Sequence, residues 1–152
     1  MAKKWNEDAD LVANLAGNLL SALAVFPRRM IKVDALSRQF NMPLSHIQIL
    51  VTLAGGDLSI GTLSEQMGIA KPNITPLVDA LCEKGYAERV RSTADRRIVN
   101  VHLTDAGSML LAAVRAAIAG QLTEKPWPVT RSGAKELNAA LASISRFSGD
   151  AE

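Results

Sequence analysis

Between residues 58 and 107 the spacing of apolar residues changes from a helical period to a strand period, and this change constrains the fold most strongly. A helix over 71–84 is predicted by an apolar stripe at helical spacing, namely Ile74, Leu77, Val78 and Leu81. After Gly85, apolar and polar residues alternate over 86–91 and again over 98–103, which is typical of the two strands of a hairpin. Residues 92–97 then form its loop.

A shorter helix precedes this one and ends at Gly68, which also makes the tight turn between the two helices. Either Ser59 or Thr62 caps its start, because both hydroxyls stand just before the apolar run. The order helix, turn, helix, hairpin predicts a winged helix-turn-helix over 43–103. The fold class is therefore mainly α with a small two- to three-stranded β wing.

Apolar helices are predicted on both sides of this domain, over 8–40 and 104–148. Pro27 interrupts the first of them, so we expect a kink or a break there. In a helix that begins near Pro43, one buried face is predicted from Ile47, Leu50, Val51 and Ala54. Thr104 is expected to cap the helix that follows the hairpin.

The terminal stripes exceed what a compact winged domain can cover, so we expect them to form a dimer interface. The residues assigned to it are Leu11, Leu15, Leu19, Leu137, Leu141 and Ile144. A dimer also fits a DNA site made of two half-sites about one turn apart, roughly 34–36 Å.

Composition excludes some classes and leaves others open. With 152 residues the chain is one domain with helical extensions, and its net charge of +2 is too small to argue for nucleic acid by itself. Cys82 is the only cysteine, which excludes an internal disulfide. No apolar run approaches the roughly 20 residues of a membrane span, and the polar N-terminus is no secretory signal, so a cytoplasmic protein is expected.

The distribution of charge favours double-stranded DNA as the partner. A helix N-terminus can enter the major groove, and arginines of a wing can enter the minor groove. The predicted DNA-binding residues are Lys71, Pro72, Asn73 and Thr75 on the second helix, with Arg89, Arg91, Asp95, Arg96 and Arg97 on the wing. Asp79 and Glu83 oppose this interpretation, because an acid that faces phosphates repels them.

From about Pro43 to Leu111 the chain resembles the MarR family of bacterial transcriptional regulators. The resemblance rests on "QILVTLA", "IGTLSEQMGIAKPNITPLVDALCEKGYAER", "DRR" at the wing and "VHLTDAGSML". It implies a homodimer on a pseudo-palindromic operator, usually a repressor that a small phenolic or anionic effector releases. It also implies that Arg97 enters the minor groove, Arg96 binds phosphate and Asp95 holds the wing. Ala70 and Pro76 depart from the family, which often has a hydroxyl residue and a basic residue there.

Other side chains carry weaker hypotheses. Arg28, Met30, Arg38 and His46 are candidates for an effector pocket, although a surface role is an equal alternative. Cys82 is expected to be a half-buried packing residue, with a thiol pKa that the neighbouring Glu83 raises. No metal site, cofactor or enzymatic site is predicted. The alternative function is a winged-helix module for protein–protein contact without DNA.

Overall fold

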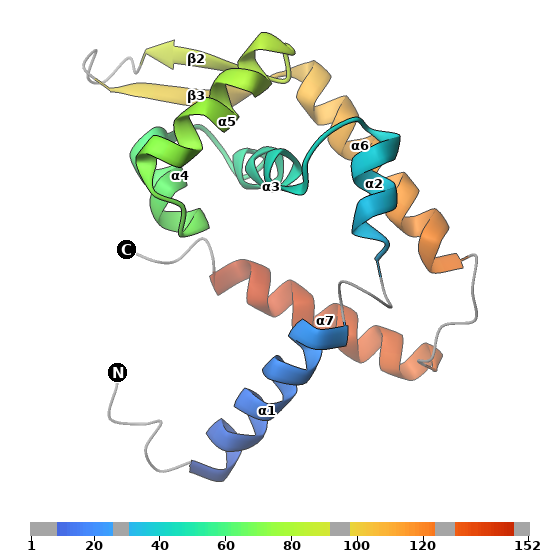
Figure 1. The fold of residues 1–152 in the computed structure, drawn as a ribbon. Coiled ribbons are helices and arrows are strands. Elements are labelled where there is room, and N and C mark those ends of the chain that lie inside the picture. Colours follow the sequence, from blue (N-terminus) through green and yellow to red (C-terminus); the bar gives the residue numbers. More distant parts are fainter. Residues whose placement is uncertain (1–8, 26–30, 92–97, 124–129, 148–152) are drawn as a thin grey trace.

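The computed structural model describes residues 9–25, 31–91, 98–123 and 130–147. In chain order its elements are α1 (Ala9–Val25), α2 (Val33–Gln39), α3 (Leu44–Leu53), β1 (Leu58–Ser59), α4 (Ile60–Met67), α5 (Lys71–Glu83), β2 (Ala87–Arg91), β3 (Val99–Leu103), α6 (Asp105–Thr123) and α7 (Arg131–Phe147) (Figure 1). The predicted order of helix, turn, helix and hairpin is confirmed, and the helical content confirms the mainly α class.

A three-stranded antiparallel sheet forms the base of the wing, in the order β1-β3-β2. Strand β2 pairs with β3 so that Arg89 lies opposite Val101, and the two-residue β1 pairs with the other edge of β3 at the same Val101. Val101 is fully buried, so the sheet is attached to the rest of the domain through its central strand.

The hydrophobic core lies between α3, the two helices of the helix-turn-helix and the sheet. The residues Ile49, Leu50, Leu63, Ile74, Val78, Leu81 and Val101 are its largest fully buried side chains. The predicted stripe of α5 is therefore confirmed, with Leu77 only partly buried. The prediction for α3 was wrong at two positions, since Val51 and Ala54 are exposed and Ile49 and Leu53 are buried instead.

Local hydrogen bonds fix where the helices begin. Ser59, not Thr62, caps α4, because its Oγ accepts from the Thr62 amide at 3.1 Å. Thr104 caps the start of α6 as predicted, with Oγ1 accepting from the Gly107 amide at 3.1 Å. Gly68 ends α4 at a φ of 63°, the left-handed conformation that a glycine adopts without steric cost.

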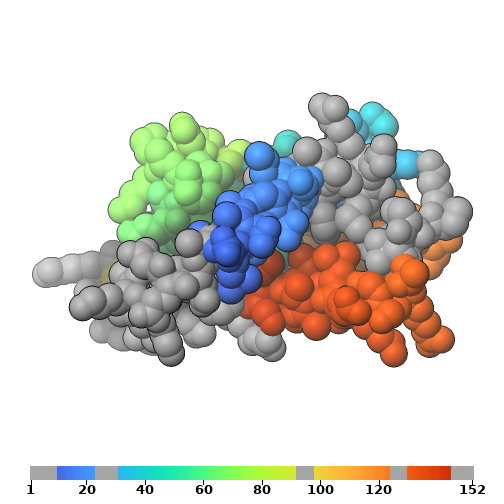
Figure 2. All heavy atoms as spheres, turned by 90° about the horizontal axis from the view of Figure 1, so that it is seen from below, coloured from blue at the N-terminus to red at the C-terminus, as the bar shows by residue number. Residues whose placement is uncertain are grey.

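The terminal helices α1 and α7 lie apart from this core. The two helices are near each other on the side of the molecule away from the sheet (Figure 1), and Figure 2 shows both on the face seen from below. Neither contributes to the buried core of the described residues. Helix α1 ends at Val25 and α2 begins at Val33. Pro27, where an interruption was predicted, lies outside the described residues, so that interruption stays a prediction.

Helix α6 differs from one expectation. It is long and apolar enough to cross a membrane by length and composition alone, contrary to the expectation that no such run exists. Gly107, Leu111 and Val114 are buried, which joins α6 to the winged domain. Met109 is 74% exposed, so much of the apolar surface of α6 is left uncovered within the described chain.

Candidate nucleic-acid interface

The first turn of α5 presents its side chains to solvent. Lys71, Pro72 and Asn73 are all exposed, while Ile74 directly after them is fully buried. Ala70 stands at the N-cap position and has no side-chain oxygen, so the amides of Asn73 and Ile74 bond only to its backbone carbonyl. This turn is therefore an exposed ridge of one cation, one amide and one apolar ring.

Thr75 continues this ridge but is half-buried and already engaged. Its Oγ1 donates to the Lys71 carbonyl at 2.8 Å, so its remaining hydrogen-bonding capacity is that of an acceptor. One residue later, Pro76 lies inside the helix and cannot donate to the Pro72 carbonyl. Both prolines are exposed, so water can reach this part of the helix and limit the cost of the missing bond.

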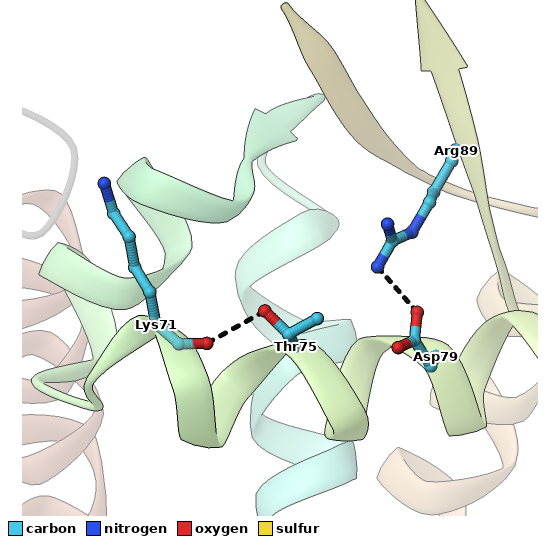
Figure 3. A network of polar contacts seen from close by, with 4 residues as sticks. All are labelled: Lys71, Thr75, Asp79 and Arg89. Atoms are coloured by element: carbon cyan, nitrogen blue, oxygen red, sulfur yellow. Dashed lines mark hydrogen bonds and ion pairs between the residues drawn. The ribbon is translucent and has the colours of Figure 1, made fainter.

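Asp79 completes the ridge and contacts the wing. Figure 3 shows Lys71, Thr75 and Asp79 along one side of α5, with Arg89 of β2 reaching down to Asp79. The Arg89 Nη2 to Asp79 Oδ1 distance is 2.6 Å. Arg89, predicted to bind DNA, is thus engaged within the protein, and the acid that opposed DNA binding has a cation beside it. Sequence reasoning missed this pair, for which opposite charge was the only signal.

The remaining wing residues extend beyond this ion pair. Arg91 is exposed on β2, opposite Val99 on β3. Asp95, Arg96 and Arg97 lie outside the described residues, so their predicted contacts stay predictions. Because Arg89 and Arg91 are two residues apart on one strand, they share a face of the sheet with Ala87.

The candidate effector residues are only partly described. Arg28 and Met30 lie outside the described residues, and Arg38 is exposed on α2. His46 on α3 has both ring nitrogens buried without a hydrogen-bond partner among the described residues. Burial and, secondly, the nearby Lys84 ammonium lower the pKa of His46, so its imidazole is held neutral. Lys84 itself donates to the Asn41 carbonyl at 3.4 Å.

Cys82 is half-buried, as predicted, but the main cause of its altered pKa is different. Burial raises the pKa of the thiol, the Arg89 guanidinium beside it acts in the opposite direction, and Asp79 and Glu88 raise it further. The charges that act on the thiol therefore belong to Arg89 and Glu88 of β2 and to Asp79 of α5, and not to Glu83, the neighbour in sequence.

A second ion pair at the base of the wing was also missed. His102 on β3 lies 2.6 Å from Asp57, measured from Nδ1 to Oδ1, and this hydrogen bond raises the pKa of His102. Asp57 comes from the segment between α3 and β1, 45 residues away in sequence. The expectation that His102 is merely an exposed strand residue was wrong, because it joins this segment to the sheet.

Part of the sequence is similar to known proteins. A MarR family model matches residues 40–98. An HTH-type transcriptional regulator from Bacillus subtilis, YsmB, is 39% identical over 59 residues, which are 39% of this chain and 40% of that protein. A second B. subtilis regulator of this type, YpoP, is 44% identical over 43 residues, which are 28% of this chain and 30% of that protein. The matches thus span less than half of these relatives.

Solved structures share the fold over most of the chain. A MarR family protein from Bacillus stearothermophilus superposes with a TM-score of 0.68 at 22% identity, covering 91% of this chain and 96% of that one. MarR from E. coli in its apo form has a TM-score of 0.65 at 18% identity, covering 84% and 94%. At these identities the likeness concerns the fold, and it includes the flanking helices as well as the winged domain.

Proposed function

We propose that the chain is a member of the MarR family of winged helix-turn-helix proteins and that it regulates transcription by binding double-stranded DNA. The observation that carries the proposal is the exposed first turn of α5, where Lys71, Pro72 and Asn73 project from a helix whose opposite side packs into the core. Such a turn can enter a major groove, where asparagine pairs with adenine and a lysine binds phosphate or guanine.

The wing supplies the second part of the proposed contact. Arg91 is exposed on the strand that leads to the loop, and Arg96 and Arg97 follow in sequence. Arginine is favoured in a narrow minor groove because the negative potential is concentrated there. In this proposal Arg97 enters the minor groove, Arg96 binds a nearby phosphate and Asp95 orients the loop.

We further propose that the functional unit is a homodimer on a pseudo-palindromic operator and that it acts as a repressor. Apolar side chains of α1 and α7 support the dimer, since Leu11, Leu15, Leu19, Leu141 and Ile144 are each between 42% and 56% exposed in the single chain. Two copies would cover these faces and present two copies of α5 to successive turns of the same DNA face.

Selection of DNA at two salt concentrations tests the proposal. Purified protein is incubated with a random duplex pool, and the retained sequences are read. We expect a pseudo-palindrome, with affinity that falls steeply as salt rises because bound phosphates release counterions. No enrichment and no salt dependence would instead support a winged module for protein–protein contact.

One substitution tests the wing on the recovered operator. Arg97→Ala should weaken specific binding by about 1–3 kcal/mol, because it removes a charged contact in a groove, and should leave fold and dimer unchanged. Fluorescence anisotropy at moderate salt measures the loss, with circular dichroism and light scattering as controls. Unchanged affinity would show that Arg97 does not contact DNA.

We also propose that a small phenolic or anionic effector binds the protein. Its candidate residues among those described, Arg38 and His46, lie on neighbouring helices α2 and α3. Salicylate, which is both phenolic and anionic, is a suitable probe. We expect it to raise the melting temperature and to weaken operator binding, with Arg38→Ala reducing both effects. Equal responses of wild type and variant would remove Arg38 from the site.

A further inference from the structure

We propose that Arg89 is a positioning residue, not a DNA ligand, which through Asp79 fixes the angle between α5 and the wing. This inference rests on the proposed DNA-binding function and deepens it. The Arg89–Asp79 ion pair holds α5, the proposed major-groove element, and the wing, the proposed minor-groove element, at one angle.

On the strand side, Arg89 projects from the face of the sheet that packs on the domain. Its partner across the ladder is Val101, which is fully buried, and Ala87 on the same face is also buried. Arg89 is thus the first residue of β2 on this face whose side chain leaves the core. From that position it reaches α5, as Figure 3 shows, and not the outer side of the wing.

On the helix side, the guanidinium meets Asp79, which accepts from Arg89 Nη2 at 2.6 Å. The charge of the Arg89 guanidinium also acts on the pKa of Cys82, three residues further along α5. Residues three apart share one face of a helix. Arg89 therefore faces this side of α5, and the ion pair with Asp79 links the strand to the helix.

The position of this contact matters because a rotation of the strand at Arg89 is enlarged along the length of the wing. Each residue of a strand adds about 3.3 Å, so a small rotation at Arg89 becomes a larger displacement at Arg91 and beyond. The side chains of Arg89 and Asp79 are 40% and 51% exposed, and an ion pair so exposed adds little to stability. Its proposed role is accordingly one of orientation.

The competing interpretation is that Arg89 releases Asp79 and binds a DNA phosphate. The two interpretations predict opposite effects of Asp79→Asn, which leaves Arg89 in place. If Arg89 is a ligand, removal of the acid frees it, and operator affinity rises. If Arg89 is a positioning residue, operator affinity falls on the order of tenfold, as expected for coupled contacts, while binding to random DNA does not fall.

A charge exchange provides the rescue. In the double variant Asp79→Arg with Arg89→Asp the ion pair is restored in reverse and the net charge is that of the wild type. We expect this variant to recover operator affinity relative to each single variant, and its salt slope to match that of the wild type. Glu83→Gln is the matched control, since it removes an acid from the same exposed side of α5 one turn later.

A measurement without DNA separates this inference from the proposed function. Residual dipolar couplings of backbone amides report the angle between α5 and the strands β2 and β3 in the free protein. We expect Asp79→Asn to change or broaden this angle and the charge exchange to restore it. An unchanged angle in Asp79→Asn overturns the inference even if the wild type binds its operator. A wild type that binds no DNA overturns the proposed function and leaves the angular result to decide whether the pair positions the wing.

Discussion

Two histidines show how single residues in this fold acquire different charges. His102 is at the surface and its Nδ1 hydrogen-bonds to the Asp57 carboxylate, which raises the pKa of His102, whereas burial of His46 beside Lys84 lowers the pKa of that imidazole. We therefore expect His102 to titrate above and His46 below the ordinary value near 6.5. The chemical shifts of the imidazole nitrogens, followed by NMR between about pH 4 and about pH 9, measure both pKa values.

The two shifts act on stability in opposite directions. The stability that the His102–Asp57 pair contributes is fully present below the unfolded pKa and is lost as pH rises through the raised pKa of His102. His46 disfavours the folded state once pH falls below its unfolded pKa and toward its lowered folded pKa, since the unfolded chain then binds the proton more readily. Asp57→Asn should return the pKa of His102 toward its ordinary value and leave that of His46 unchanged; a His102 pKa unaffected by this change would contradict the assigned cause.

At the scale of elements, the junction between the wing and α6 depends on one glycine. Thr104 donates to the Gly85 carbonyl at 2.6 Å and its amide donates to the Tyr86 carbonyl, which draws the start of α6 onto the end of the helix-turn-helix. A Cβ on Gly107 would collide with the Tyr86 carbonyl oxygen and lie 2.6 Å from Leu103 Cδ1. The Tyr86 backbone cannot move aside as a flexible side chain can, so the close approach of the two segments requires glycine at position 107.

Gly107→Ala should therefore lower the free energy of unfolding by about 1–3 kcal/mol, the usual cost of overpacking. Gly120→Ala is the matched control, because it lies in the same helix and an added Cβ meets nothing within 4 Å. It should raise stability by up to about 1 kcal/mol through helix propensity. Urea denaturation compares the two variants, and equal effects would show that the junction can relax.

Several elements could be predicted from the sequence, whereas the contacts between them could not. The stripe of α5 was predictable because only one face of that helix is apolar, and β2 and β3 were predictable as strands because residues alternate in polarity on both sides of the loop. Helix α3 is apolar on more than one side, so periodicity alone could not choose between Val51 and Leu53, and the exposed one was chosen. The Asp79–Arg89 and Asp57–His102 pairs join elements whose relative angle depends on packing of the whole core. No local sequence pattern predicts the angle between these elements.

For the whole molecule, the uncovered apolar surface is the feature that a single chain does not explain. The stripe of α1 is exposed at Leu11, Leu15 and Leu19, and α6 leaves Met109 exposed although Leu111 and Val114 of the same helix are part of the core. Contiguous exposed apolar surface marks an interface in most proteins that are stable in water. The solved structures share the fold over 84–91% of the chain, so the likeness extends beyond the winged domain.

A charge placed on this stripe should then separate the two copies. Leu15→Glu puts a carboxylate where two apolar faces would meet, and burying it without a partner costs far more than the exposed leucine contributes. Ala13→Glu adds the same charge to the same helix, but two residues apart on a helix point to nearly opposite sides, and Ala13 is also exposed. Light scattering should give monomers for Leu15→Glu and dimers for Ala13→Glu. If both variants stay dimeric, the interface does not include the α1 stripe; if both become monomeric, charge on α1 matters and not its position.

Because two half-sites are read together only by a dimer, the monomeric variant should also lose operator binding far more than binding to a single half-site.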